Sequence, residues 1–278
     1  MIAVALATLC AVVYGTADFF GGLATRRSRV MAVVVLSQGA GLALVVALMP
    51  LLPGAPTAPA LAWGMAAGVS GAAGLVLFYR ALATGVMSVV APTTATTSAA
   101  LPVLYGLATG ERPEPTALGG VALALVAVLL VSRDPSRATS GNGYGPLLTS
   151  LAAGAGFGGF FVLLAQAPEE AGMWPLFGAR LSSIGLIALL ALATGRTLRP
   201  GTGALRIILA AGILDMVANV LFVLAQQRGM LSLVGVLVSL YPASTLVLAR
   251  YVLKERLNVV QMTGIGFTLA AVALIAAG

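Results

Sequence analysis

The sequence is poor in charged residues. Only 8% of its 278 residues are Asp, Glu, Lys or Arg, whereas 60% are hydrophobic. Soluble domains contain about 25% charged residues, so this chain has too little charge to cover a soluble globule. Disordered chains are also excluded, because they are poor in apolar residues. The composition therefore predicts a polytopic membrane protein whose surroundings are largely lipid.

Histidine is absent, and cysteine occurs only once, at Cys10. The chain therefore lacks the commonest metal ligand, the usual general base near neutral pH and every Ser-His-Asp triad. A lone cysteine cannot form an internal disulfide or a thiolate metal cluster. The sequence also lacks the Gly-x-x-x-x-Gly-Lys motif that binds nucleotide phosphates, so this chain alone does not use ATP. We expect no cofactor and no metal, and the scattered basic residues do not favour nucleic acid as a partner.

Ten apolar stretches predict ten membrane-spanning helices. A helix needs about 20 apolar residues to cross the ~30 Å hydrocarbon core, and charged or Pro/Gly-rich breaks separate the stretches. The Ser/Gly-rich residues 135–145 are expected to be a linker, so residues 1–134 form a first five-span repeat and residues 146–278 a second. The predicted spans are 2–25, 30–49, 58–82, 88–108, 116–132, 146–166, 174–194, 204–226, 231–249 and 258–277.

The two halves share an internal repeat. Residues 75–131 align without a gap on residues 219–275, and 17 of these 57 positions are identical. Glu111-Arg112 falls on Glu255-Arg256, a match that apolar composition does not explain. Because each repeat holds an odd number of spans, the second must lie upside down in the membrane. Inverted repeats are typical of secondary transporters, whose substrate site lies near the midplane between the halves.

In these features the chain resembles the drug/metabolite transporter superfamily, in its EamA branch. The resemblance covers essentially the whole chain. It rests on the five-plus-five spans, the inverted repeat, Tyr14-Gly15 with Asp18-Phe19 in the first span, and the Glu-Arg pairs after spans four and nine. It implies an all-α transmembrane fold, a ten-helix bundle made of two inverted five-helix repeats, with a central cavity for a small metabolite.

Basic residues are divided unevenly between the two ends of the predicted bundle. Twelve fall in loops at one end, and only Arg112 and Arg228 fall in loops at the other. Because cytoplasmic loops carry an excess of Lys and Arg, we expect a protein of the cytoplasmic membrane with both termini outside. The twelve are Arg26, Arg27, Arg29, Arg80, Arg133, Arg137, Arg196, Arg199, Arg206, Arg250, Lys254 and Arg256.

Two carboxylates fall inside predicted spans, where an ionisable side chain is costly and marks a candidate functional site. Asp215 lies near the middle of its span, with Asn219 one turn later on the same face. A medium of low dielectric constant favours the neutral carboxyl, so Asp215 could bind and release a proton, or it could pair structurally with another helix. Asp18 has Tyr14 one turn away. It either lines a cavity or pairs with the neighbouring arginines.

Arg180 is the only arginine clearly within a span, and it requires a counter-charge or an anion. It could anchor a substrate carboxylate or phosphate, which would favour an anionic substrate. Alternatively it could pair with Asp215, because the two spans are consecutive and antiparallel. Gln38 occupies the equivalent position of the first repeat, so the charge is present in one half only.

The fourth and ninth spans carry hydroxyl side chains together with proline. Such runs are typical of a slightly broken helix that lines a cavity, although the hydroxyls could instead bond to their own helices. They add Thr93, Thr97 and Tyr241 to the candidate site. Glycine runs in the first helix of each repeat favour close helix packing, and we expect these two helices to pack at the pseudo-two-fold axis.

Together these observations predict a secondary transporter that moves a small metabolite or drug by alternating access. The nearest alternatives are a lipid or lipid-linked sugar flippase or a channel of the same fold. An intramembrane lipid-modifying enzyme is less favoured, because no clustered catalytic set is present, and we expect no enzymatic activity. The expected partners are a small-molecule substrate, membrane lipid, protons as a candidate coupling ion, and a second copy of the chain in a homodimer. The candidate cavity residues are Tyr14, Asp18, Thr93, Thr97, Arg180, Asp215, Asn219 and Tyr241.

Overall fold

The computed structural model describes residues 1–25, 27–51, 54–84, 87–131, 144–195, 197–254 and 258–277. Throughout these ranges the regular structure is helical, and no strand occurs in them. The helices are α1 (Ile2–Thr25), α2 (Val30–Leu48), α3 (Ala58–Thr84), α4 (Met87–Ala108), α5 (Pro115–Val131), α6 (Tyr144–Ala165), α7 (Trp174–Ala193), α8 (Leu205–Gln226), α9 (Leu231–Val238), α10 (Tyr241–Val252) and α11 (Val259–Ala277), with a short 3-10 helix η2 (Glu169–Ala171) before α7.

The helix ends follow from local sequence, as α7 illustrates. Pro175 lies in the first turn of α7, where its missing N–H has no intrahelical partner to lose. Beyond the last turn, Gly195 adopts the left-handed conformation, with a φ of 62°. Glycine is the residue that adopts this conformation without steric cost, and it commonly ends a helix in this way. The local sequence therefore accounts for both ends of α7.

The ninth predicted span is two helices rather than one. α9 ends at Val238 and α10 begins at Tyr241, with Ser239 and Leu240 between them. Pro242 lies in the first turn of α10, where it cannot donate the hydrogen bond that would continue the helix. The prediction of a broken helix is thus confirmed for this span. It is wrong for the fourth span, because α4 runs unbroken from Met87 to Ala108.

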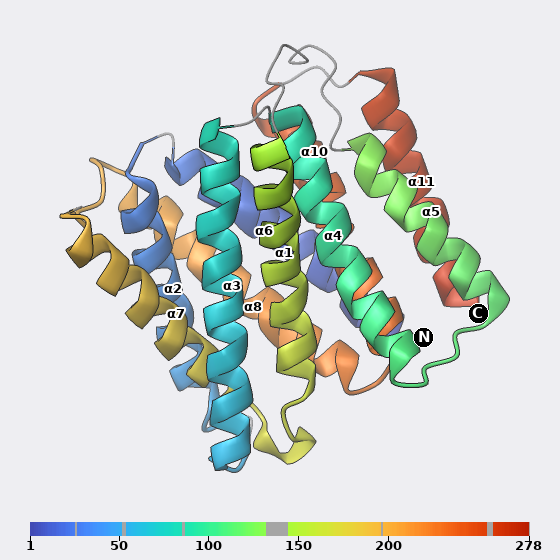
Figure 1. Cartoon of the computed structure of the whole chain (residues 1–278), viewed down its shortest axis with the longest axis horizontal. Coiled ribbons are helices and arrows are strands. Elements are labelled where there is room, and N and C mark those ends of the chain that lie inside the picture. Colours follow the sequence, from blue (N-terminus) through green and yellow to red (C-terminus); the bar gives the residue numbers. More distant parts are fainter. Residues whose placement is uncertain are drawn as a thin grey trace.

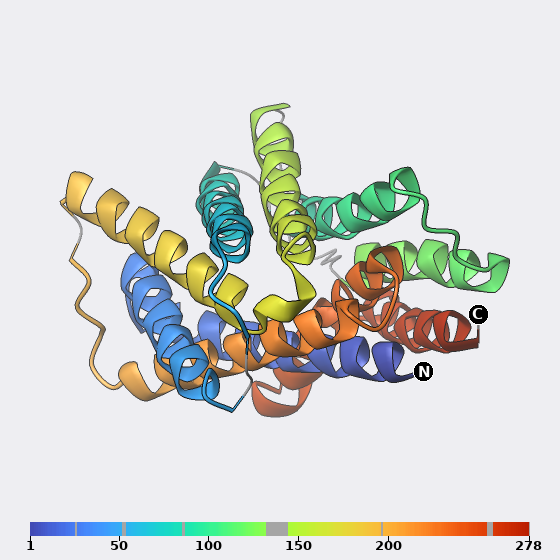
Figure 2. The same ribbon diagram turned by 90° about the horizontal axis from the view of Figure 1, so that it is seen from below.

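The helices pair reciprocally across the bundle. α2 and α7 lie on one lateral side of the bundle, and α5 and α11 lie next to each other on the opposite lateral side (Figures 1 and 2). Between them, α3 packs against α6 as α8 packs against α1, and α4 packs against α6 as α10 packs against α1. This pattern is what two equivalent five-helix halves would produce. The division into residues 1–134 and 146–278 itself stays a prediction.

The outer surface of the bundle suits a membrane. Within the described residues, eight helical segments are long and apolar enough to cross a bilayer, and α5 is a shorter apolar helix. Large apolar side chains are exposed on the outside of several of them, including Leu189, Leu192, Met262 and Leu269. Aliphatic side chains on the outer face are expected where the solvent is lipid. The multi-helix transmembrane bundle predicted from composition is therefore confirmed.

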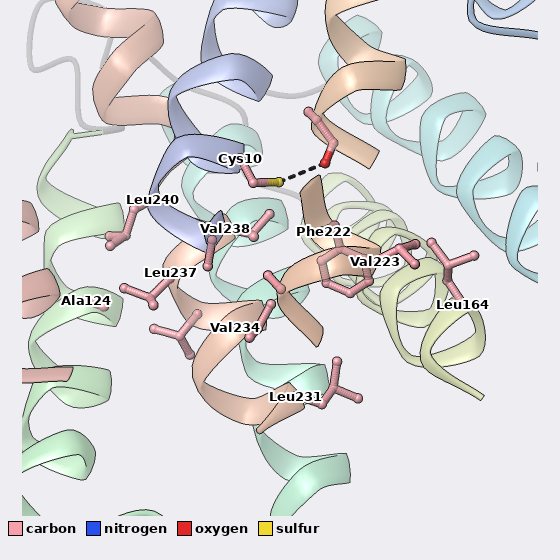
Figure 3. Packing of buried hydrophobic residues seen from close by; sticks show 14 of the residues in the cluster. Cys10, Ala124, Leu164, Phe222, Val223, Leu231, Val234, Leu237, Val238 and Leu240 are labelled. Atoms are coloured by element: carbon pink, nitrogen blue, oxygen red, sulfur yellow. Dashed lines mark hydrogen bonds between the residues drawn. The ribbon is translucent and has the colours of Figure 1, made fainter. Parts of the chain in front are cut away.

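The apolar core centres on α9. Leu231, Val234, Leu237 and Val238 of this helix are all buried, and they pack with Phe222 of α8 (Figure 3). In the same cluster, the buried Cys10 thiol of α1 donates a hydrogen bond to the Ala218 carbonyl of α8, at 3.1 Å (Figure 3). The core thus fixes α1, α8 and α9 relative to one another. Of these helices, α1 carries Tyr14 and Asp18, and α8 carries Asp215 and Asn219.

Candidate functional site

An ion pair joins α7 to α8 inside the bundle. The Arg180 guanidinium donates to the Asp215 carboxylate, as the order of the two antiparallel spans predicted. The Arg180 side chain is only 8% exposed, whereas that of Asp215 is 32% exposed. Asp215 lies at the middle of α8, far from either helix end. The pair is therefore deep in the bundle, and its carboxylate is the partner that remains accessible.

Gln38 of α2 completes the surroundings of the guanidinium. Its side-chain oxygen accepts hydrogen bonds from Arg180 and from the Ser183 hydroxyl, the latter at 3.1 Å. Gln38 and Arg180 occupy equivalent positions in the predicted repeats. Equivalent residues meet only where they lie on or near a two-fold axis. Sequence comparison identified this equivalence but not the contact, because nothing local in the sequence brings α2 to α7.

Asn219 extends the network by one turn of α8. Its amide donates to the Asp215 backbone carbonyl at 2.8 Å and to the Asp215 carboxylate at 3.4 Å. The side chain is buried, and its oxygen has no hydrogen-bond partner within the part of the chain that the structure describes. Buried polar atoms are nearly always hydrogen-bonded. The Asn219 oxygen is thus a free acceptor beside an accessible carboxylate.

An aromatic layer lies next to this polar network. The ring of Tyr14 on α1 contacts that of Tyr241 on α10, with centroids 6.4 Å apart, and that of Phe161 on α6 at 6.2 Å. Phe161 in turn contacts Phe222 of α8 at 4.7 Å. Sequence analysis selected the two tyrosines but missed Phe161. The aromatic run of α6, Phe157 to Phe161, was the signal that could have found it.

Asp18 is the second carboxylate of this region. It is exposed, and among the described residues no hydrogen bond or ion pair involves it, so it does not pair there with Arg27 or Arg29. An exposed carboxylate this far along a spanning helix cannot face lipid without large cost. The place of Asp18 in the candidate site stays a prediction.

The predicted threonines of α4 lie elsewhere. Thr97 lies against Gly154 of α6, in the interface between α4 and α6. In that interface the Thr94 hydroxyl donates to the Ser150 carbonyl of α6 at 3.1 Å. The side chain of Thr93 lies outside the described residues. Of the eight predicted positions, the structure thus brings Arg180 and Asn219 to Asp215 and pairs Tyr14 with Tyr241, whereas Thr97 lies in the interface between α4 and α6.

The hydroxyls of α10 serve helix packing. Ser244 donates to the Ala11 carbonyl of α1 at 3.0 Å, and Thr245 donates to the Gly15 carbonyl at 2.9 Å. A side chain at Gly15 would overlap Ser244 and the backbone of Tyr241, so the missing side chain permits this approach. The glycine runs therefore pack α1 against α10, and α6 against α3 and α4. The expectation that these two first helices pack closely on each other is not met.

Known proteins resemble this chain in sequence over its second half and in fold over its whole length. Residues 145–277 match the model of the EamA-like transporter family. One solved structure, described only as the crystal structure of a protein, is 18% identical to this chain. The similarity covers 99% of this chain and 98% of that one, with a TM-score of 0.81. At this identity the likeness shows the fold alone. No curated protein sequence matches the chain.

Proposed function

We propose that this chain, whose residues 145–277 match the model of the EamA-like transporter family, is a secondary transporter of a small metabolite or drug. Its two five-helix halves, residues 1–134 and 146–278, rock about the site at Asp215, so that the site opens to each side in turn. The protein lies in the cytoplasmic membrane with both termini outside, in keeping with the bias of basic residues.

The buried ion pair is the observation that carries this proposal. A buried ion pair is weak evidence for stability, since desolvation of the charges offsets their attraction. In a membrane span the cost of a charge makes function the default explanation. Here the Arg180–Asp215 pair is accompanied by the unsatisfied Asn219 oxygen and by an accessible carboxylate edge. Such groups suit a site that exchanges one polar partner for another.

The balance of charges favours a proton or a cationic group as the exchanged partner. The positive charge of Arg180 is already matched by Asp215, so the arginine is not free to hold an anion. Asp18 has no such counter-charge among the described residues. A proton or a substrate ammonium group at Asp18 would supply the missing positive charge. The nearby Tyr14 and Tyr241 rings offer faces that attract organic cations. A cationic substrate therefore replaces the anionic one that Arg180 alone had suggested.

Coupling follows from competition for the same carboxylates. A proton bound at Asp18 or Asp215 removes the negative charge that a cationic substrate needs, so substrate and proton exclude each other from the site. If the transporter changes its open side only when either the substrate or a proton is bound, and not when the site is empty, it exchanges substrate for protons across the membrane.

Transport in proteoliposomes tests the proposal. The purified chain is reconstituted with a pH-sensitive dye inside, and candidate amines, cationic drugs, amino acids, sugars and nucleosides are added outside. Addition of a transported cation should change the internal pH, and Asp18→Asn and Asp215→Asn should each lower that change at least tenfold. Glu169→Gln, an exposed carboxylate in the η2 loop, is the matched control and should behave as wild type. Unaltered proton movement in the Asp18→Asn/Asp215→Asn double variant, with folding verified by size-exclusion chromatography, would contradict proton coupling.

A further inference from the structure

A second polar site lies at the end of the bundle where α1 turns into α2 and α7 turns into α8. A cavity of about 450 Å³ opens there to the surface, a size within the range of small-molecule sites. It is separate from the ion pair of Arg180, and the transport proposal makes no use of it. The lining residues are Thr25, Arg27, Ser28, Arg29, Thr197, Arg199 and Gly201.

The cavity is built by two loops that are fastened to each other. The Gly201 N–H donates to the Ser28 hydroxyl at 3.0 Å, and Arg29 donates to the Thr197 hydroxyl at 3.1 Å. Gly201 also packs against the Arg27 carbonyl so closely that a side chain there would overlap it. The bonded residues of the two loops are 168 and 173 positions apart in the sequence, yet the relative position of the loops is fixed. The charged groups on them are therefore held near one another before any ligand binds.

Three guanidinium groups converge on this cavity without a carboxylate to balance them. Arg27, Arg29 and Arg199 are all exposed, and no acidic side chain lines the cavity. Among the described residues no ion pair involves any of the three. Guanidinium groups bind phosphate and carboxylate oxygens in paired hydrogen bonds. The site is thus complementary to a phosphate-bearing anion.

An adjoining cavity favours a lipid as the source of that phosphate. A space of about 340 Å³ shares Arg29 and Thr197 with the first cavity and extends to Val30 and Met31, in the first turn of α2. The polar cavity thus continues, past a shared arginine, along the apolar start of a spanning helix. A soluble anion has no apolar part that would contact Val30 and Met31. A phospholipid has a charged headgroup followed by apolar chains, which matches a basic cavity followed by an apolar one.

We propose that this pocket binds the phosphodiester headgroup of an anionic phospholipid. Arg27, Arg29 and Arg199 contact the phosphate and the anionic head, and the first acyl carbons follow Val30 and Met31 along α2. Basic pockets between transmembrane helices on the cytoplasmic side are suited to anionic lipids. The bound lipid joins the loop after α1 to the loop after α7, which fixes the spacing of these helices at that end of the bundle.

Native mass spectrometry of the full-length protein tests this assignment. The detergent-purified chain is titrated with phosphatidylglycerol, with zwitterionic phosphatidylcholine and with inorganic phosphate. Phosphatidylglycerol should bind more tightly than the other two, and its affinity should fall with rising salt. Arg199→Gln should weaken it about fivefold, the change expected for one basic residue at an anionic surface, and Arg27→Gln/Arg199→Gln about 25-fold.

Arg206→Gln is the matched control, since Arg206 is exposed in the first turn of α8 at the same end but does not line the pocket. It should leave affinity within twofold of wild type. Arg27→Lys/Arg199→Lys keeps the charges and should retain most of the binding, even if the glutamine variants fold poorly. Equal affinity for phosphatidylglycerol in wild type, Arg199→Gln and Arg206→Gln would overturn the proposal. Inorganic phosphate binding as tightly as phosphatidylglycerol would overturn the lipid assignment in favour of a soluble anion.

Discussion

Two loop pairs at opposite ends of the bundle share one construction and differ in charge. At one end, residues 27–29 are fastened to residues 197–201, which we call the basic clamp. At the other end, residues 54–57 are fastened to residues 168–174, which we call the acidic clamp. There the Ala55 N–H donates to the Glu170 carbonyl at 3.0 Å, and the Trp174 indole donates to the Gly54 carbonyl at 3.2 Å. In the proposed repeat the loop after α1 corresponds to the loop after α6, and the loop after α2 to the loop after α7, so the clamps are equivalent.

The two clamps share their backbone geometry and differ in the charge of their side chains. Both clamps contain a glycine pressed against the backbone of the facing loop, Gly201 on Arg27 and Gly54 on Ala171. Close approach of the two loops is therefore a property of the fold. Charge is not: the basic clamp carries three exposed arginines, and the acidic clamp carries the exposed Glu169 and Glu170. Geometry is repeated by the inversion, whereas charge distinguishes the two faces of the membrane.

The largest effect is expected from filling the glycine of either clamp. A side chain at Gly201 would overlap the Arg27 carbonyl, and one at Gly54 would overlap the backbone of Ala171. Because backbone must move in both cases, Gly201→Ala and Gly54→Ala should each lower the free energy of unfolding by about 1–3 kcal/mol. Thermal unfolding in detergent measures this. Gly266→Ala in α11, where a side chain meets open space, should cost nothing. Loss of stability at only one clamp would break the equivalence.

A smaller effect is expected from a carboxylate at the same end as the acidic clamp. Both oxygens of Glu111, in the loop between α4 and α5, accept hydrogen bonds from the first N–H groups of α9: Leu231 at 2.7 Å and Ser232 at 2.9 Å. Glu111→Gln removes one acceptor and the charge that favours a helix N-terminus, at a cost of about 1 kcal/mol. Glu114→Gln, in the same loop, is the control. The equivalent Glu255 lies outside the described residues. Equal stability of Glu111→Gln and wild type would show that the cap is dispensable.

Removing one side-chain bond from each clamp should have a slighter effect. Arg29→Ala deletes the bond to Thr197, and Trp174→Phe deletes the bond to Gly54 while a ring remains beside Phe177. Each bond is exposed, so each change should cost about 0.5–1 kcal/mol. Only the Arg29→Ala cost should depend on lipid, because added phosphatidylglycerol stabilises the wild type more than the variant. A lipid-dependent cost for Trp174→Phe would contradict the assignment of lipid to the basic clamp alone.

The smallest effect is expected on orientation. A five-residue variant would change the charges of both clamps: it replaces Arg27, Arg29 and Arg199 by Gln and Glu169 and Glu170 by Lys. This variant keeps nine basic loop residues at one end against four at the other. The bias keeps its sign, so both termini should remain outside. A Thr57→Cys reporter, labelled with membrane-impermeant and membrane-permeant reagents on cells, measures this. Labelling from both sides would show that the remaining bias does not suffice and that the clamp charges are needed for orientation.

Much of the fold could be predicted because span length and charge are local properties. Every predicted span coincides with observed helices to within a few residues, and Pro242 foretold the break between α9 and α10. The family match confirms the resemblance drawn from the repeat and the short motifs. The Arg180–Asp215 pair was one of two alternatives open for Arg180, and it forms although α2, rather than α7, packs against α8. The Gln38 contact and the fastening of the clamps were not, since they join segments more than 100 residues apart.

The buried thiol of Cys10 makes the protein convenient for spectroscopy. It is fully buried and is the chain's one cysteine, and a thiol reacts only when it is accessible as the thiolate. Any cysteine introduced at the surface will therefore be the sole reactive one in an otherwise native sequence. Pairs of such positions, one in each loop of a clamp, would carry fluorophores or spin labels without prior removal of native thiols. Distances across both clamps can then be followed as substrate, proton or lipid is added.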